Sequence, residues 1–309
     1  MGYSKGFCDA QWRVAMYTEK VYLVAGGDGR YVHLADLLTQ RGTVYAVGFD
    51  NPSDFSPEVR YRAAPGEVEQ RPDYLVLPMP VTKNGVTVFT PLSRENLLLS
   101  QVLDLCGRET LVLGGKVDEK TVLACEKRGL ALADYLEREE FAVLNAIPTA
   151  EGAVQIAMKE LPMTLSGQRV LITGYGRVAK LCHRAFAALG SQVTVAARSC
   201  RDLAWAQAYG AHTVPLSFLN RVLPKFQVVV NTVPARVFGE EQLMLLDAGT
   251  LIIDLASAPG GVDYSAAAGL GIKAIPALSL PGKVAPVTAA EAIAGTLDNI
   301  IAERGSAYV

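Results

Sequence analysis

A glycine-rich turn near the middle of the chain carries the clearest chemical signal. Residues 169–173 form a short apolar stretch typical of a β-strand, and they lead directly into the segment Gly174–Ala179, which reads GYGRVA. An amphipathic helical stretch follows and ends before a second strand. In this setting Gly174 permits a tight turn, Gly176 lets the backbone approach a pyrophosphate, and Ala179 permits close packing of the helix on the strand.

The first turn of that helix would offer free N–H groups and the positive end of its dipole to the phosphates of a dinucleotide. We therefore predict a dinucleotide site, with an ordinary structural turn as the alternative. The expected contacts with the pyrophosphate are Gly174, Tyr175, Gly176, Arg177 and Val178.

The end of the next strand indicates which dinucleotide binds. An NAD site usually has an acidic residue there, which accepts hydrogen bonds from the ribose hydroxyls. This strand instead ends in Ala197, Arg198 and Ser199, with no carboxylate in residues 193–199 and with Arg198 22 residues after Gly176. Because a guanidinium and a hydroxyl suit a 2′-phosphate, we predict NADP as the cofactor. A solvated surface arginine is the alternative.

Two later strands are also followed by residues that could line the cofactor site. In an open parallel sheet, ligands bind beyond the carboxyl ends of the strands, so these residues and the glycine-rich turn are expected at one edge. Thr232–Pro234 would lie at the nicotinamide-side ribose, whereas Asp254 could equally cap a helix or form a turn. The expected contacts are Asn231, Thr232, Val233, Pro234, Asp254 and Leu255.

The first half of the chain contains a second glycine-rich turn, Gly26–Arg30, which reads GGDGR. Its spacing differs from that of a dinucleotide turn, so we favour a substrate-binding turn over a second phosphate site or a purely structural turn. Lys283, in an expected loop at residues 281–286, could bind a carboxylate or face solvent. No histidine follows a strand near the expected nicotinamide, which disfavours a histidine-assisted 2-hydroxy acid dehydrogenase. The residues do not identify a catalytic acid or base.

Short strand-like stretches alternate with amphipathic helical stretches along all 309 residues, which predicts an α/β protein with doubly wound parallel sheets. We expect a substrate domain at residues 1–148, of which 1–15 form an extension, and a dinucleotide-binding domain at 149–288. A helix at 289–309 would return to the first domain. Thr149 is expected to cap a helix that begins at Ala150. The expected strands are 21–25, 43–48, 74–77, 86–90, 110–113, 169–173, 192–197, 227–231, 250–254 and 273–275.

Composition excludes several classes of protein. The chain has 29 basic and 31 acidic residues, and it has no block of five or more like charges, so nothing indicates binding to nucleic acid or an anionic membrane. Half of the residues are hydrophobic, which argues against a disordered chain. Five scattered cysteines and three separated histidines predict neither a disulfide framework nor a metal site. No signal sequence or membrane span is expected, so we predict a cytoplasmic protein.

Several segments resemble the family of A subunits of bacterial dipicolinate synthase, and the resemblance extends from about Val21 onwards. These segments are Gly26–Arg30, Glu140–Ala153, Gly174–Ala179 with Ala197–Ser199, and Ser279–Pro286. The extension before about Met16 is not part of the family pattern. The domain plan is also similar to the 2-hydroxy acid and alanine dehydrogenases. That similarity implies a flavodoxin-like N-terminal domain and a Rossmann NADP-binding C-terminal domain.

The resemblance implies an NADP-dependent oxidoreductase that converts dihydro- or hydroxytetrahydro-dipicolinate to pyridine-2,6-dicarboxylate during sporulation. It implies a flavoprotein-like B subunit of dipicolinate synthase as the partner and the mother cell of a sporulating bacterium as the location. On this interpretation the residues that hold the small dicarboxylate substrate are Asp28, Arg30, Thr149 and Lys283. Another amino- or imino-acid dehydrogenase is the first alternative, and a non-catalytic NADP-binding protein is the second.

Overall fold

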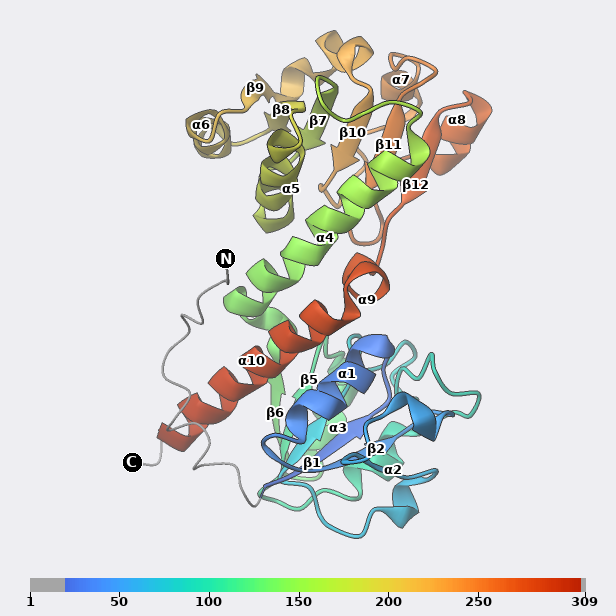
Figure 1. Ribbon diagram of the computed structural model, residues 1–309, viewed down its shortest axis with the longest axis vertical. Coiled ribbons are helices and arrows are strands. Elements are labelled where there is room, and N and C mark those ends of the chain that lie inside the picture. Colours follow the sequence, from blue (N-terminus) through green and yellow to red (C-terminus); the bar gives the residue numbers. More distant parts are fainter. Residues whose placement is uncertain (1–19, 307–309) are drawn as a thin grey trace. The chain divides into compact units, whose positions relative to one another are not determined.

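The computed structural model describes residues 20–306, so the expected extension at residues 1–15 lies outside the described part of the chain. The described chain divides into two compact units (Figure 1). The first unit contains residues 20–142 and 286–306, and the second contains residues 143–285. The sequence predicts these boundaries between the units a few residues later, after 148 and 288. The first boundary differs because a single helix, Glu139–Glu160, runs through it.

The first unit is built on a six-stranded parallel sheet in the order β3-β2-β1-β4-β5-β6. Without the two-residue edge strand β3, this is the order of flavodoxin-like sheets. The strands are β1 (Lys20–Ala25), β2 (Gly42–Val47), β3 (Arg60–Tyr61), β4 (Tyr74–Val76), β5 (Leu111–Gly114) and β6 (Ala131–Asp134). The helices are α1 (Gly29–Leu38), α2 (Leu99–Leu103), α3 (Glu119–Glu126) and α10 (Pro286–Ser306), with short 3-10 helices at Pro52–Asp54, Pro65–Glu67 and Tyr135–Glu137.

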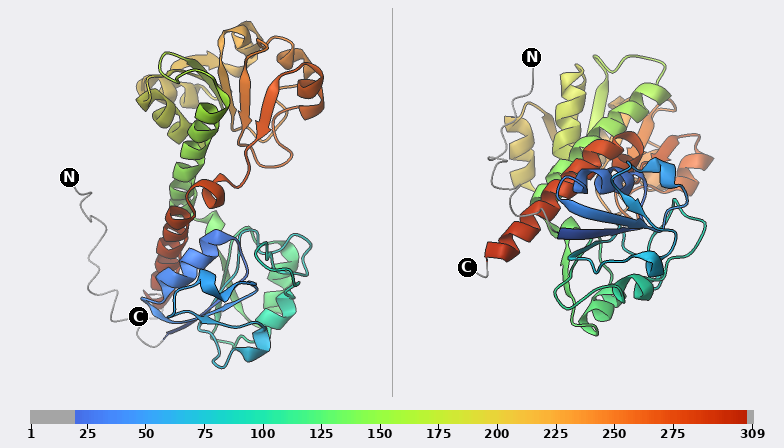
Figure 2. Two further views of the ribbon diagram at one scale, coloured as in Figure 1. Left: turned by 45° about the vertical axis from the view of Figure 1, so that its right-hand side comes forward. Right: turned by 60° about the horizontal axis from the view of Figure 1, so that its bottom comes forward.

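Helices cover both faces of this sheet (Figure 2). On one face α1 and α10 pack against alternate residues of β1 and β2, including Tyr22 and Val24. On the other face α2 and α3 pack against the intervening residues, including Leu23 and Ala25. The strands are therefore apolar on both sides, as expected for a buried parallel sheet. Within the first unit, Glu303 of helix α10 forms an ion pair with the Arg138 guanidinium at 2.6 Å.

The second unit has a parallel sheet in the order β12-β11-β10-β7-β8-β9, which is the order of a Rossmann fold. Its strands are β7 (Arg169–Thr173), β8 (Gln192–Ala197), β9 (His212–Pro215), β10 (Val228–Asn231), β11 (Leu251–Asp254) and β12 (Lys273–Pro276). Its helices are α4 (Glu139–Glu160), α5 (Arg177–Ala188), α6 (Cys200–Ala208), α7 (Glu240–Leu243), α8 (Tyr264–Gly269) and α9 (Leu280–Val284), with 3-10 helices at Leu216–Arg221 and Leu223–Lys225. Residues of α4, α5, α6 and α9 share one core on the sheet, and residues of α7, α8 and the 3-10 helices share the core on its other face.

Helix α4 corrects two expectations, namely that a helix begins at Ala150 and that Thr149 caps it. The helix begins at Glu139 and continues through Pro148. Thr149 therefore does not cap a helix; its Oγ1 donates a hydrogen bond to the Asn145 carbonyl at 3.0 Å, one turn earlier. A proline inside a helix removes one backbone hydrogen bond. Buried residues on both sides of it, Ala146 and Ala150 among them, stabilise the uninterrupted helix.

The uninterrupted length of α4 also corrects the expectation that no segment has the length and hydropathy of a membrane span. Its 22 residues include a window with a mean hydropathy of 1.2, so it passes that test by length and composition alone. A core helix of a soluble domain passes the same test, and Ala150, Ala153 and Ala157 pack into the core of the second unit.

Three strands, β3, β6 and β9, were not expected, and one expected strand is absent. Residues 86–90 make only isolated bridge contacts, such as Thr82 with Val88 and Thr87 with Leu98. The expected loop at 281–286 instead contains the short helix α9. The two sheets and their parallel pairing are otherwise those that the sequence predicts.

Candidate functional site

The glycine-rich turn lies at the carboxyl end of β7 and starts α5. Gly174 has φ +84°, and a Cβ atom there would lie 2.7 Å from Thr232 Oγ1, so both its conformation and its neighbour require glycine. Gly176 is the N-cap of α5, and a Cβ there would have no neighbour within 4 Å. Ala179 is fully buried against the sheet. The turn thus leaves open space in front of a helix N-terminus, which fits the pyrophosphate of a dinucleotide.

A cavity of about 460 Å³ adjoins this turn at the carboxyl ends of β7, β8 and β10. It brings together the glycine-rich turn, the end of β8 and the segment after β10, as the sequence predicts for a cofactor site. Among residues 20–306, Arg198 has no ion-pair partner, and its side chain is exposed. The lining residues are Gly174, Ala196, Ala197, Arg198, Ser199, Asp202, Leu216 and Val233.

Sequence reasoning missed Asp202, whose position follows from the start of α6. Ser199 is the N-cap of α6, and its Oγ accepts a hydrogen bond from the Asp202 N–H at 3.4 Å. The Asp202 carboxylate lies 3.5 Å from Arg201 Nε. The pattern of a serine followed three residues later by an acidic residue is a helix-start signal that could have revealed it. Asp202 brings a negative charge to the cavity that Arg198 lines, so it opposes part of the attraction for a phosphate.

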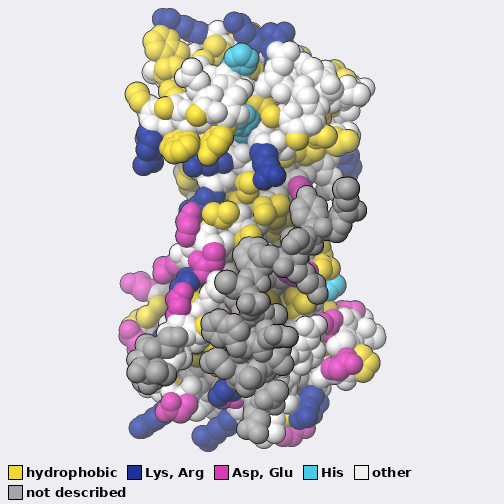
Figure 3. Space-filling model, turned by 60° about the vertical axis from the view of Figure 1, so that its left-hand side comes forward, with side chains coloured by type: hydrophobic (Ala, Val, Ile, Leu, Met, Phe, Trp, Pro, Cys, Tyr) yellow, Lys and Arg dark blue, Asp and Glu magenta, His cyan; other side chains and the backbone are white. Residues whose placement is uncertain are grey.

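Basic side chains surround this part of the second unit. Arg177, Lys180 and Arg184 are exposed at intervals of three and four along α5, which contains no acidic residue. Figure 3 shows the Lys and Arg side chains spread over this unit, with few Asp or Glu side chains on the same face. A positive surface of this kind attracts an anionic dinucleotide and speeds its association.

The side chain of Tyr175 does not line the cavity. It is buried, and its hydroxyl forms a 3.0 Å hydrogen bond with His183 Nδ1 within the second unit's core. Burial raises the pKa of Tyr175 and lowers the pKa of His183, so both side chains are uncharged at neutral pH. The backbone of Tyr175 is therefore the part that could contact a cofactor.

Asn231 and Asp254, which end neighbouring strands, bond to each other rather than project into the cavity. Asn231 Nδ2 donates a 2.7 Å hydrogen bond to Asp254 Oδ1, and its Oδ1 accepts a 2.6 Å bond from Thr173 Oγ1. Both residues are almost fully buried. Their hydrogen bonds connect the carboxyl ends of β7, β10 and β11. These bonds stabilise the edge of the sheet where a ligand would bind.

The second oxygen of Asp254 fastens the loop that follows β11. Asp254 Oδ2 accepts hydrogen bonds from the Gly261 N–H at 3.0 Å and from the Tyr264 hydroxyl at 2.9 Å, and Oδ1 accepts one from the Ala256 N–H. Burial and the bond to Asp254 raise the pKa of Tyr264. Both oxygens of Asp254 thus accept hydrogen bonds from the protein itself, two from backbone N–H groups and two from side chains.

The other expected contacts after these strands differ in position. Thr232 Oγ1 donates a 2.7 Å hydrogen bond to the Thr173 carbonyl, so its side chain stabilises the start of the glycine-rich turn. Leu255 donates its N–H to the Asn231 carbonyl. Pro234 is exposed and, unlike Val233, does not line the cavity.

The turn in the first unit differs from a phosphate site, because a carboxylate already occupies its helix N-terminus. Asp28 is the N-cap of α1, and its two oxygens accept 2.8 Å hydrogen bonds from Arg30 Nε and Nη2. Arg30 is 3% exposed. Burial lowers the pKa of Arg30, but the hydrogen bonds to Asp28 and the charge interactions with Asp28, Tyr31 and Tyr135 together outweigh it, so the net shift of the pKa is upward. The pair is therefore charged and internally neutralised.

The four expected substrate-binding residues lie in different units. Asp28 and Arg30 belong to the first unit, whereas Thr149 and Lys283 belong to the second. Thr149 is half-buried in the middle of α4, and Lys283 is exposed in the last turn of α9. Each unit thus contributes one pair of the expected residues.

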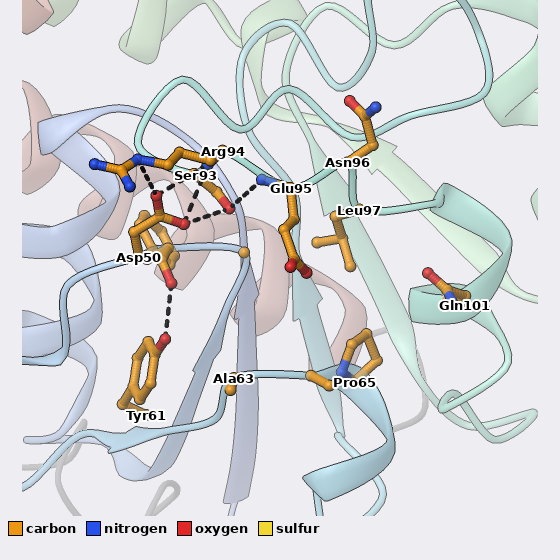
Figure 4. A pocket seen from close by; sticks show the side chains of 13 residues that line it. Asp50, Tyr61, Ala63, Pro65, Ser93, Arg94, Glu95, Asn96, Leu97 and Gln101 are labelled. Atoms are coloured by element: carbon orange, nitrogen blue, oxygen red, sulfur yellow. Dashed lines mark hydrogen bonds and ion pairs between the residues drawn. The ribbon is translucent and has the colours of Figure 1, made fainter.

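A larger cavity, of about 670 Å³, lies in the first unit near the ends of β2 and β3 (Figure 4). Asp50 accepts hydrogen bonds there from Ser93 Oγ at 2.8 Å and from the Arg94 N–H. Glu95 adds a second carboxylate, and Arg94 is the one cation among the lining residues. This charge balance suits a neutral or cationic molecule better than a dicarboxylate, and none of the expected site residues lines the cavity.

Comparison with known proteins agrees with this architecture along nearly the whole chain. The family model for the N-terminal domain of the dipicolinate synthase A subunit matches residues 21–136. The chain is 34% identical over 294 residues to the A subunit of dipicolinate synthase from Bacillus subtilis (strain 168), and the match covers 93% of this chain and 98% of that protein. This chain belongs to the family of dipicolinate synthase A subunits.

Solved structures support the same assignment. The crystal structure of the dipicolinate synthase A subunit from Bacillus halodurans superposes with a TM-score of 0.84 at 33% identity, over 93% of this chain and 99% of that one. An L-alanine dehydrogenase superposes with a TM-score of 0.61 at 13% identity, over 90% of this chain and 88% of that one. The second likeness concerns the fold alone, and it matches the domain plan that the sequence predicts.

Proposed function

We propose that this member of the family is the NADP-binding, catalytic subunit of a dipicolinate synthase. It would oxidise dihydrodipicolinate, or hydroxytetrahydro-dipicolinate with loss of the ring hydroxyl as water, to pyridine-2,6-dicarboxylate, with transfer of a hydride to NADP and release of a proton. The observation that carries the proposal is a single cavity that joins the glycine-rich turn of β7 to Arg198 and Ser199 at the end of β8. Family membership supports the substrate, and the cavity supports the cofactor.

Several residues of the second unit would hold NADP. The N–H groups in the first turn of α5 would bind the pyrophosphate, with Gly176 leaving the space that it needs. Arg198 would bind the 2′-phosphate through its guanidinium, and Ser199 would add a hydroxyl. Val233 would pack beside the nicotinamide-side ribose. When bound, NADP would accept the hydride that leaves the substrate ring.

The remaining work of the protein is to bind and orient the substrate. Formation of an aromatic ring favours loss of the hydride and of a ring proton, so the reaction asks less of a catalytic acid or base than alcohol oxidation does. Asp28, Arg30, Thr149 and Lys283 stay the proposed substrate-binding residues. The Asp28–Arg30 pair would offer its remaining guanidinium N–H groups rather than an unpaired charge.

We also propose a companion protein in the same complex. The B. subtilis and B. halodurans relatives are both named as A subunits, which supports the existence of a differently named partner. The resemblance implies that this partner is a flavoprotein-like B subunit, and it implies the cytoplasm of the mother cell of a sporulating bacterium as the location.

Cofactor preference tests the NADP part of this proposal. We expect the wild-type chain to bind NADP at least about tenfold more tightly than NAD, because a charge-assisted contact with the 2′-phosphate contributes about 1.5–3 kcal/mol. Isothermal titration of each cofactor into the full chain measures this ratio. Equal affinities would show that the cavity does not select NADP.

A further inference from the structure

Lys116 adopts a strained backbone conformation that glycine would adopt without strain. Lys116 has φ +52°, in the left-handed region, and within residues 20–306 Ser279 is the other non-glycine residue with a positive φ. Side chains other than glycine rarely adopt this conformation, and the strain persists where the surroundings fix it, often at functional sites. Gly114 and Gly115 precede Lys116, so the segment already carries glycines but has lysine at the position that favours one.

The neighbouring strand fixes this conformation through Asp134. Its carboxylate accepts hydrogen bonds from the N–H groups of Lys116 at 3.1 Å, Val117 at 2.7 Å and Leu136 at 2.8 Å. Three backbone N–H groups thus hold the Asp134 carboxylate in place. The ammonium group of Lys116 forms no ion pair within 4 Å in the described part of the chain, and the residue is exposed. Asp134 thus fixes the backbone of Lys116, whereas the ammonium group of Lys116 has no carboxylate partner in the described chain.

Lys116 lies at the edge of the sheet where the first unit would bind a ligand. It follows β5, which pairs with β4, and ligands of parallel sheets bind beyond the carboxyl ends of such strands. Gly115 abuts the ring of Tyr135, whose hydroxyl is 2.5 Å from the hydroxyl of Tyr31. Tyr31 follows Arg30 in α1.

The buried Tyr31–Tyr135 pair therefore connects the segments that carry the two cations. Arg30 and Lys116 both adjoin it, one through Tyr31 and the other through Gly115. Asp28 neutralises Arg30 by two hydrogen bonds, whereas Lys116 retains an unpaired charge. A dicarboxylate that bound at this edge would find at Lys116 a cation that no carboxylate of the described chain neutralises.

We propose that Lys116 is a further residue of the first unit, in addition to the Asp28–Arg30 pair, that binds a carboxylate of the substrate. The inference rests on the proposed function, because it takes the ligand to be a small dicarboxylate. A purely structural role does not account for the lysine, because glycine at this position would relieve the strain and would keep the hydrogen bonds that the N–H groups of residues 116 and 117 donate to Asp134.

Two substitutions separate the side chain from the backbone. Lys116→Gly and Lys116→Asn both tolerate a positive φ, and neither carries the charge. Lys127→Asn is the matched control, because Lys127 is an exposed lysine of the same unit at the C-cap of α3. Titration of pyridine-2,6-dicarboxylate into the full chain saturated with NADP measures ligand affinity. Thermal unfolding and NADP titration measure whether the fold and the cofactor site are intact.

We expect both Lys116 variants to bind the dicarboxylate roughly five- to tenfold more weakly, with NADP affinity and melting temperature not reduced. Lys127→Asn should leave all three quantities unchanged. A dicarboxylate affinity that stays within about twofold of wild type in both Lys116 variants would overturn the assignment of Lys116, as would a loss that accompanies a lower melting temperature. Absence of dicarboxylate binding to the wild-type chain would instead overturn the proposed function, and this inference with it.

Discussion

Replacing Arg198 by Ala is expected to weaken NADP binding by roughly 10- to 150-fold and to leave NAD binding almost unchanged. Arg198 lines the cavity next to the glycine-rich turn, and it has no ion-pair partner among residues 20–306. Its guanidinium can form two parallel hydrogen bonds with a phosphate, but it has no comparable partner on a ribose hydroxyl. The preference for NADP should therefore largely disappear. Isothermal titration of both cofactors into both proteins measures the change.

A charge-matched control removes the general effect of losing a cation. Arg184→Ala changes an exposed arginine on α5 that does not line the cavity, so the ratio of the two affinities should stay close to wild type. If Arg198→Ala leaves the ratio unchanged, Arg198 does not bind the 2′-phosphate. Asp202→Asn gives a second check: removing a carboxylate from the same cavity should strengthen NADP binding.

Replacing Asp254 by Ala is expected to lower the free energy of unfolding of the second unit by at least about 3 kcal/mol, because it leaves several buried donors without an acceptor. The buried donors are the N–H groups of Ala256 and Gly261 and one of the two N–H bonds of Asn231 Nδ2, whose other acceptor is the Val233 carbonyl. The hydroxyl of the exposed Tyr264 also loses its acceptor. Each unpaired buried donor costs about 1–3 kcal/mol of folding free energy. Water that enters the space left by the carboxylate can accept some of these hydrogen bonds and reduce the cost. The loss should exceed that of an ordinary surface substitution by far.

Urea unfolding followed by the fluorescence of Trp205, the tryptophan in the described part of the chain, reports on the second unit. Asp247→Ala is the control, because Asp247 is an exposed carboxylate of the same unit. Its change should stay within about 0.5 kcal/mol. A similar small change for Asp254→Ala would mean that the hydrogen bonds of Asp254 do not hold the loops around the cavity.

The part of the second unit around the glycine-rich turn was predicted closely, because each local signal there agrees with the fold. The bounds of β7 and β8 coincide with the expected ones, and the turn between them has the expected positive φ at Gly174. The tight turn, the packing alanine and the strand alternation are all local properties. They can therefore be recognised from residues that lie close together in the chain.

Features that depend on tertiary contacts were harder to predict. Pro148 is typical of a helix boundary, yet α4 passes through it because buried residues on both sides pack into a core. Strand β3 has two residues, too few for any periodic signal. Residues 86–90 have the composition of a strand but find no neighbouring strand to complete a ladder.

The candidate site shows the same division. Arg198 and Ser199 follow from their distance along the chain to the glycine-rich turn, whereas Asp202 enters the cavity only because α6 begins at Ser199. Asn231 and Asp254 were correctly expected at the carboxyl edge of the sheet. Their hydrogen bond to each other depends on the pairing of β10 with β11, which the sequence does not reveal. The strained backbone at Lys116 has no local sequence signal, because lysine is not a residue that favours a positive φ.

Simultaneous measurement of both products tests the central claim most directly. The full chain is mixed with its companion protein, freshly prepared hydroxytetrahydrodipicolinate and NADP, and the absorbances of pyridine-2,6-dicarboxylate and NADPH are followed together. The proposed function predicts that both products form at the same rate. Gly174→Ala in this chain, which forces a Cβ against Thr232, should abolish both, whereas Gly249→Ala, with no neighbour within 4 Å, should not. Pyridine formation without NADPH, or an undiminished rate with Gly174→Ala, would contradict the account.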